Sequence, residues 1–206
     1  MSNDEATARL AVLRHGPTAW NEAGQIQGHS DQPLSPAGMA AVAGWHLPAA
    51  LQDWTWYRSP LRRTAMTAAA LGHPEARVEA RLIEMDWGDW EGARLAELRR
   101  SLGAEMTAME ARGLDFRPPA GESPRDVQAR LQPFLAELGR RRETAVAVAH
   151  KGVIRALYAV ARGWPMTGRP PEKLREPCYH VFALDRDGRP RVEALNCPLL
   201  RERGTP

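Results

Sequence analysis

Residues 144–161 read TAVAVAHKGVIRALYAVA and contain a strand, a histidine and a helix in direct succession. The small and β-branched residues of 144–149 are typical of a buried strand. The apolar residues after Gly152 recur at helical spacing as far as Ala161. A buried strand that leads into a helix is typical of a layered α/β sheet, so His150 is expected where one strand of that sheet ends.

Strands and helices alternate along the rest of the chain. Short runs rich in branched and aromatic residues predict strands at 9–13, 54–57, 77–79, 179–184 and 191–195. Helical runs are expected at 35–45, 59–71, 93–112 and 123–142. Three of these helices begin with serine followed by proline, which suits the N-cap and the first helical position. Because helical crossovers favour parallel strands, we expect an α/β three-layer sandwich with a mostly parallel central sheet flanked by helices.

Two segments are expected outside this pattern. Leu82–Gly92 contains two glycines and fits neither the helical nor the strand period, so it predicts a surface loop. The proline-rich Gly113–Gly121 predicts a flap. It would belong to an insertion at about residues 92–122. The length of the chain predicts a single domain that spans 1–206. The tail after Pro198 is expected to be loose.

Length and composition exclude several classes of protein. The 206 residues are 43% hydrophobic and 26% charged, which is typical of a globular domain and not of a disordered or fibrous chain. Neither a membrane span nor a secretory signal is legible, so we expect a cytoplasmic protein without membrane contact. A net charge of +3 with dispersed basic residues gives no nucleic-acid footprint. Two cysteines form neither a disulfide framework nor a C-x-x-C metal site.

Cationic side chains are expected at the carboxyl ends of the strands. Arg14 and His15 end the first strand, Arg63 lies in the first turn of a helix, and His150 ends the strand 144–149. In an open α/β sheet these ends form the ligand crevice. Guanidinium and imidazole groups repel one another unless an anion is present, and arginine matches phosphate oxygens. Each residue alone has an ordinary structural explanation, but their joint placement favours a phosphate site.

Six segments also carry family-type motifs: Leu13–Asn21 (LRHGPTAWN), Gly28–Gly38 (GHSDQPLSPAG), Ser59–Ala68 (SPLRRTAMTA), Leu82–Gly92 (LIEMDWGDWEG), Gly121–Asp126 (GESPRD) and Val148–Leu157 (VAHKGVIRAL). In residues, order and spacing they resemble the motifs of the histidine phosphatase superfamily, in its phosphoglycerate-mutase-like branch. The resemblance covers residues from about 9 to 160. It implies the phosphoglycerate-mutase-like form of the α/β sandwich.

The resemblance implies a covalent mechanism. His15 would be the nucleophile and would become a phosphohistidine. Arg14, Arg63 and His150 would clamp the phosphate oxygens. Thr18 and Asn21 would be donors to phosphate or substrate. No metal and no cofactor are implied, and the partner would be a small phosphorylated substrate bound by a monomer or a homodimer.

Glu84 is implied as the acid and base of the reaction. It would protonate the leaving alkoxide and then activate water, which requires a pKa raised by desolvation against Met85 and Trp87. Glu91 and Glu122 are rival acids with simple structural roles available to them. Lys151 departs from the glycine that the family usually carries after the second histidine. If the backbone has a positive φ there, lysine adds strain, and its amine adds a cation.

Three functions remain open at this point. A phosphomonoester hydrolase is favoured over a phosphoglycerate-type mutase because only 66 positions separate Glu84 from His150, whereas mutases usually carry longer segments that exclude water. A non-catalytic phosphate-docking module is disfavoured because the nucleophile and the clamp residues are all present. The substrate is not readable: sugar phosphates, nucleotides, phosphoglycerates and α-ribazole phosphate all fit.

Overall fold

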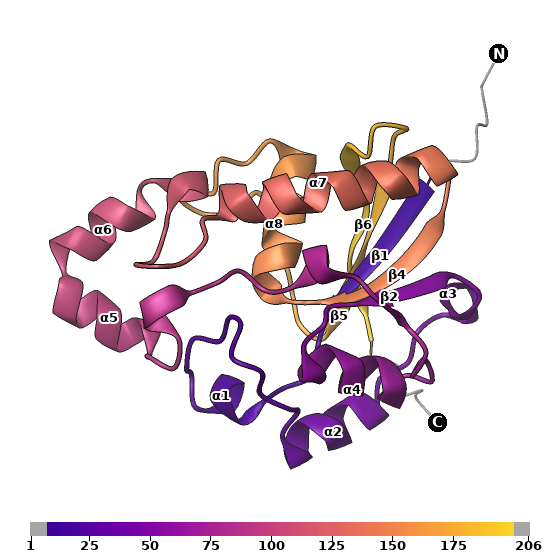
Figure 1. Ribbon diagram of the computed structural model, residues 1–206, viewed down its shortest axis with the longest axis horizontal. Helices are drawn as coiled ribbons and strands as arrows, with labels where there is room; N and C mark the ends of the chain where they lie inside the picture. The colour runs from indigo at the N-terminus through magenta and orange to yellow at the C-terminus, as the bar shows by residue number, and fades with distance from the viewer. Residues whose placement is uncertain (1–7, 200–206) are drawn as a thin grey trace, which may run out of the picture.

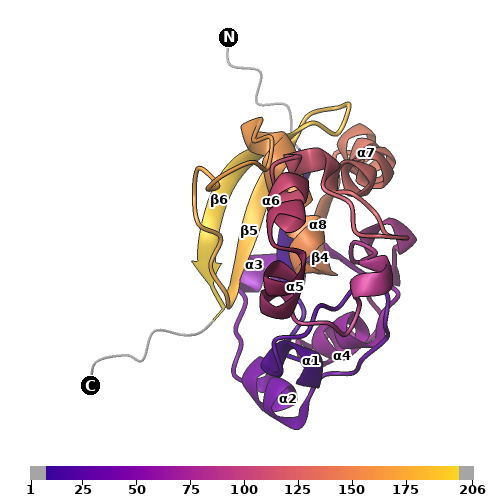
Figure 2. The same cartoon turned by 90° about the vertical axis from the view of Figure 1, so that its left-hand side faces the viewer.

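The computed structural model describes residues 8–199 and has the expected α/β architecture, with a six-stranded sheet in the order β3-β2-β4-β1-β5-β6 (Figure 1). The strands are β1 (Ala8–Arg14), β2 (Thr55–Arg58), β3 (Arg77–Val78), β4 (Thr144–Ala149), β5 (Cys178–Leu184) and β6 (Pro190–Pro198). The first four pair in parallel, whereas β5 and β6 are antiparallel to their neighbours. Figure 2 shows β6 at the outer edge of the sheet.

Helices cover both faces of the sheet. They are α1 (Ala19–Glu22), α2 (Pro36–Ala43), α3 (Ala49–Gln52), α4 (Arg62–Ala70), α5 (Leu95–Leu102), α6 (Ala104–Glu110), α7 (Pro124–Arg141) and α8 (Lys151–Arg162). Residues of α7 and α8 pack on one face, and residues of α3 and α4 pack on the other. In Figure 1, α5 and α6 project beyond the end of the sheet. No helix within residues 8–199 is long and apolar enough to cross a membrane.

The two central strands place alternate side chains in two separate cores. In β1, Leu10 and Val12 face α7 and α8, whereas Ala11 and Leu13 belong to the opposite core. In β4 the alanines join the first core and the two valines join the second. Burial on both faces explains why these strands contain uninterrupted apolar runs, and it fixes the register that aligns their carboxyl ends.

The predicted helix start at Ser59 is wrong. The helix α4 begins at Arg62 with Leu61 at its N-cap position and no capping side chain. The hydroxyl of Ser59 instead lies 2.8 Å from Nε2 of His150 and also accepts a bond from the backbone N–H of Leu61. His150, which follows the distant strand β4, therefore engages the hydroxyl that was expected to cap the helix.

Leu82–Gly92 is irregular, as predicted, but its predicted position at the surface is wrong, because Leu82, Glu84, Met85 and Trp90 are buried. Two short 3₁₀ turns, Ala80–Leu82 and Gly88–Trp90, carry these side chains inward without a regular period. The predicted helix 93–112 is divided into α5 and α6 at Gly103, whose φ of 51° is left-handed.

Residues of α5 and α6 pack on a third, small apolar cluster. Its buried members are Ile26, Trp90 and Met106, of which only Met106 belongs to the segment 92–122. The predictions of a single domain and of a flap in this region stay predictions. At the other end of the chain, Leu199 is buried. The rest of the tail predicted to be loose lies outside the described residues.

Candidate active site

His15 directly follows β1 and is held beside the end of β4 by a hydrogen bond from its backbone N–H to the carbonyl of Ala149, 3.0 Å. Its ring Nδ1 lies 2.6 Å from the carbonyl oxygen of Gly16. Because a carbonyl only accepts, Nδ1 carries the proton and Nε2 presents its lone pair. Burial, reinforced by Arg14 and Arg63, holds the pKa of His15 well below its usual value. The ring is therefore a neutral imidazole at neutral pH.

His150 lies next to this ring, with 5.1 Å between the two ring centroids. Its Nδ1 accepts a bond from Nε of Arg63 (3.2 Å), so Nε2 carries the proton and donates to Ser59. Burial and the neighbouring His15 hold the pKa of His150 well below its usual value. His150 is neutral, and both of its ring nitrogens are bonded to protein groups.

Arg63 is fully buried at the first turn of α4. Two of its nitrogens donate to backbone carbonyls, at 2.7 Å to Gly28 and 3.0 Å to Ser30. Burial lowers the pKa of Arg63 to about 10, so the guanidinium stays charged at neutral pH. The carboxylate of Glu91 accepts bonds from the backbone N–H groups of His29 and Ser30. Glu91 therefore holds the loop that orients Arg63.

Arg14 ends β1 and forms an ion pair with Glu176, with 2.5 Å between Nη1 and Oε2. Its Nε is buried and finds no hydrogen-bond partner within residues 8–199. A buried donor without a partner is costly, about 1–3 kcal/mol, and is a natural contact for a ligand oxygen. The sequence analysis missed Glu176, which sits in a run of mixed charges that gives no signal of this pairing.

The side chain of Glu84 is also buried. Its carboxylate accepts bonds from the backbone N–H groups of Met85 (2.9 Å) and Gly152 (3.1 Å), the latter in the first turn of α8. Burial raises the pKa of Glu84, as expected for a group that must carry a proton. A Cβ on residue 152 would lie 2.4 Å from Oε1 of Glu84. A side chain at 152 would therefore displace the carboxylate of Glu84 from its present position.

The expected strain at Lys151 is absent. Lys151 is the first residue of α8 and is not among the described non-glycine residues with positive φ. Its side chain is exposed. The close approach of the backbone to the site is made one residue later, at Gly152, so the loss of the family's first glycine leaves the geometry intact.

Thr18 and Asn21 are bonded within their own loop. Thr18 is the N-cap of α1 and exchanges hydrogen bonds with Asn21 in a capping box. Both side chains also donate to Oε1 of Gln27. Trp87, which was expected to desolvate Glu84, packs edge-on against Phe116, with 5.9 Å between the ring centroids. The roles of Thr18 and Asn21 as donors to a substrate stay predictions.

The structure brings together the side chains that the sequence singled out. Electrostatic coupling joins Arg14 and Arg63 both to the two buried histidines and to Glu84. The rival acid Glu122 accepts a bond from the backbone of Asp86 and pairs with Arg130 at 3.0 Å, which is a structural role. The site therefore combines two neutral imidazole rings, two guanidiniums and a carboxyl group that tends to hold its proton.

The family model of the histidine phosphatase superfamily (branch 1) matches residues 10–198. The chain belongs to this superfamily. One member, the glucosyl-3-phosphoglycerate phosphatase of Mycobacterium tuberculosis, is 36% identical over 180 residues, which cover 78% of this chain and 80% of that protein. The 2,3-bisphosphoglycerate-dependent phosphoglycerate mutase of Bartonella bacilliformis is 32% identical over 167 residues, covering 75% and 81%.

Solved histidine phosphatase structures have the same fold. A mycobacterial glucosyl-3-phosphoglycerate phosphatase in complex with VO3 superposes with a TM-score of 0.74 at 31% identity, and the match covers 92% of this chain and 99% of that one. The predicted family and the predicted fold class are both confirmed.

Proposed function

We propose that the protein is a metal-independent phosphomonoester hydrolase that acts on a small phosphorylated metabolite through a phosphohistidine. One observation carries the proposal: Nε2 of a buried, neutral His15 keeps its lone pair, and the adjacent residue Arg14 has a buried Nε that finds no partner within residues 8–199. Nucleophilic catalysis by histidine requires this protonation state, because a protonated ring has no lone pair to donate.

The reaction has two displacements. In the first, Nε2 of His15 bonds to phosphorus, the ester P–O bond breaks, and Glu84 donates its proton to the departing alkoxide. In the second, the carboxylate of Glu84 takes a proton from water, water bonds to phosphorus, and the N–P bond breaks. Glu84 ends the cycle protonated, inorganic phosphate leaves, and the ring of His15 returns to its neutral form.

Two arginines supply the positive charge for both displacements. Nε of Arg14 is available for a phosphoryl oxygen, and Arg63 is held rigidly by its carbonyl partners. Pre-oriented cations stabilise the charge that builds on the equatorial oxygens without reorganising during the reaction. His150 would contact the phosphate through Nε2 after the hydroxyl of Ser59 exchanges partners.

A mutase is the second candidate, because phosphoglycerate mutases also match this chain at 32% identity. The two functions differ in the acceptor of the phosphoryl group, which is water in a hydrolase and a substrate hydroxyl in a mutase. Cytoplasmic location, monomeric or dimeric state, and absence of nucleic-acid or membrane contact stay predictions.

The deciding assay incubates the purified protein with p-nitrophenyl phosphate and separately with 3-phosphoglycerate plus a trace of 2,3-bisphosphoglycerate, which would phosphorylate the histidine of a mutase. We expect stoichiometric inorganic phosphate from p-nitrophenyl phosphate, and no 2-phosphoglycerate from 3-phosphoglycerate. His15→Asn is the matched variant and should release no phosphate. Rapid isomerisation of phosphoglycerate without phosphate release would make the protein a mutase instead.

A further inference from the structure

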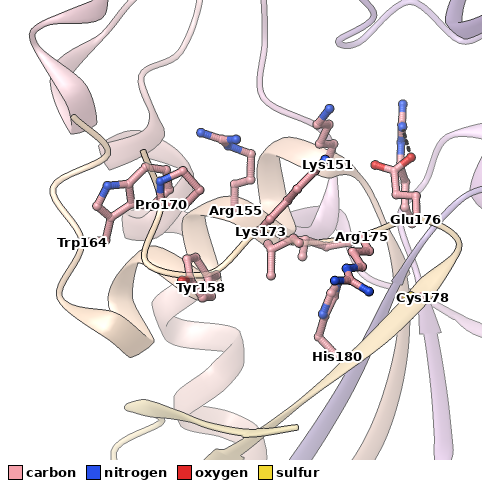
Figure 3. A pocket seen from close by; sticks show the side chains of 13 residues that line it. Lys151, Arg155, Tyr158, Trp164, Pro170, Lys173, Arg175, Glu176, Cys178 and His180 are labelled. Atoms are coloured by element: carbon pink, nitrogen blue, oxygen red, sulfur yellow. Dashed lines mark hydrogen bonds and ion pairs between the residues drawn. The ribbon is translucent and has the colours of Figure 1, made fainter. Parts of the chain in front are cut away.

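A cavity of about 190 Å³ lies between α8 and the segment 164–178 that leads into β5. Arg14 lines it and thereby connects it to the candidate active site. In Figure 3, Lys151 and Arg155 extend from α8 to the same side, while Lys173 and Arg175 come from the facing segment. Lys151 and Arg155 are four residues apart, which places them on one face of the helix. The volume suffices for a small organic fragment.

The lining of this cavity is strongly cationic. Besides Arg14, it contains Lys151, Arg155, Lys173 and Arg175, and its one carboxylate, Glu176, is already bonded to Arg14. Burial lowers the pKa of His180 to about 4, so that ring adds no charge at neutral pH. None of the other four cations has a carboxylate partner in the described part of the chain. The positive charge of the cavity is therefore not neutralised by the protein.

Arg155 is the most informative of these side chains. It is half-buried, burial lowers its pKa, and its guanidinium lies 5.2 Å from the ring centroid of Trp164. Arg162, two turns further along α8, is paired with Glu172. Burying a charge without a counter-ion is unfavourable unless a ligand supplies one. Stacking on the tryptophan keeps the guanidinium at the cavity while leaving its N–H groups for an anion.

We propose that this cavity is a second anion subsite, which binds a carboxylate or a second phosphate of the substrate while the scissile phosphate lies between Arg14 and His15. The inference rests on the proposed function, because Arg14 connects the two sites. It makes Lys151 and Arg155 specificity-determining residues and defines the substrate class as small phosphate monoesters that carry another anionic group.

The test compares substrates that share one scissile ester. All three substrates carry a primary phosphate ester. The far carbon is an alcohol in glycerol 3-phosphate, a carboxylate in 3-phosphoglycerate and a second, equivalent phosphate ester in glycerol 1,3-bisphosphate, whose rate is therefore divided by two. We expect kcat/KM to rise at least tenfold from the alcohol to one or both of the anionic substrates, the effect of about one charge-assisted hydrogen bond. The member with the larger rise identifies which anion the cavity prefers.

Substitutions in the cavity test whether the preference for anionic substrates arises there. Arg155→Gln and Lys151→Gln should each reduce the ratio of kcat/KM between the anionic substrate and glycerol 3-phosphate by fivefold or more. Arg155 also packs on Trp164, so Lys151→Gln, at an exposed position, is the variant that leaves the packing intact. Arg186→Gln removes an exposed arginine from the turn 185–188 and should leave the ratio unchanged.

The outcomes separate the two proposals. Equal kcat/KM for all three substrates, together with hydrolysis of p-nitrophenyl phosphate, overturns the subsite and leaves the phosphatase. A preference that survives both cavity variants also overturns the subsite. Failure to hydrolyse p-nitrophenyl phosphate as well as the three glycerol compounds overturns the proposed function itself.

Discussion

Burial shifts the pKa values of Glu84 and His15 in opposite directions, and both shifts suit the proposed chemistry. The pKa of Glu84 is raised, so its carboxyl group tends to hold the proton that the leaving group needs. The pKa of His15 is lowered, so its ring tends to keep its lone pair. Activity should fall on the low-pH side as His15 titrates below its ordinary value of 6.5, and on the high-pH side as Glu84 titrates above its ordinary value of 4.5.

Glu84→Gln should remove the fall in activity on the high-pH side, because the side-chain amide of glutamine does not titrate. For an alkyl phosphate, kcat/KM should drop by about 10²–10⁴, the contribution of a general acid. For p-nitrophenyl phosphate the drop should be much smaller, since p-nitrophenolate is a stable anion that leaves without a proton. Steady-state kinetics with both esters from pH 4 to 9 give the comparison. An equal loss with both esters would show that Glu84 is not the acid.

At the scale of single residues, the sequence motifs predicted which residues lie at the site, but they did not predict the contacts that these residues make. Arg14, His15, Arg63, Glu84 and His150 all lie at one site, because strand ends bring together residues far apart in sequence. The contacts of Arg14 with Glu176 and of His150 with Ser59 were not predicted. They join segments that no local pattern links.

At the scale of elements, the serine-proline signature succeeded twice and failed once. Ser35 and Ser123 cap α2 and α7 through bonds from backbone N–H groups, whereas the hydroxyl of Ser59 is engaged by His150. The segment 82–92 was correctly predicted to be irregular, but its burial was not predicted. Its buried residues follow neither the helical nor the strand period and are interspersed with acidic residues, so no periodic pattern marks them as core.

Ser123→Ala should lower the free energy of unfolding by on the order of 1 kcal/mol, because it removes the cap of the long helix α7. Ser123 accepts from the backbone N–H of Asp126, whose carboxylate in turn accepts from the backbone N–H of Ser123 at 2.7 Å. Urea unfolding followed by circular dichroism measures the change. Ser101→Ala, near the end of α5, is the control and should change little. Equal midpoints for the two variants would contradict the role of the cap.

At the scale of the whole molecule, the fold class followed from strand and helix order, but the strand directions did so only in part. The helical crossovers correctly predicted parallel pairing among the four strands β1, β2, β3 and β4. The antiparallel strands β5 and β6 close the other edge of the sheet. The tight turn at 185–188 between them is the local signal for that pairing.

Buried neutral histidines should make the folded protein sensitive to acid. Burial lowers the pKa values of His15, His150 and His180, the last from 6.5 to about 4. Between these pH values the unfolded chain binds more protons than the folded one, so stability falls as pH falls. From pH 7 to 5, His180 alone should account for a loss on the order of 2 kcal/mol.

His180→Asn tests this sensitivity. Nδ1 of His180 accepts a hydrogen bond from the backbone N–H of Asn196, and the amide oxygen of asparagine offers an acceptor of similar reach that does not titrate. Urea unfolding at pH 7 and pH 5 should show a smaller loss of stability in the variant than in the natural protein. Parallel losses in the two proteins would mean that His180 does not contribute.

The central claim is that the phosphoryl group passes through Nε2 of His15, and trapping the intermediate tests it most directly. The enzyme is mixed with ³²P-labelled substrate, quenched in alkali within milliseconds to seconds, and digested for mass spectrometry. We expect one acid-labile, alkali-stable phosphoryl group on His15, and no label on His15→Asn. Label on a different residue, or full turnover by His15→Asn, would contradict the account.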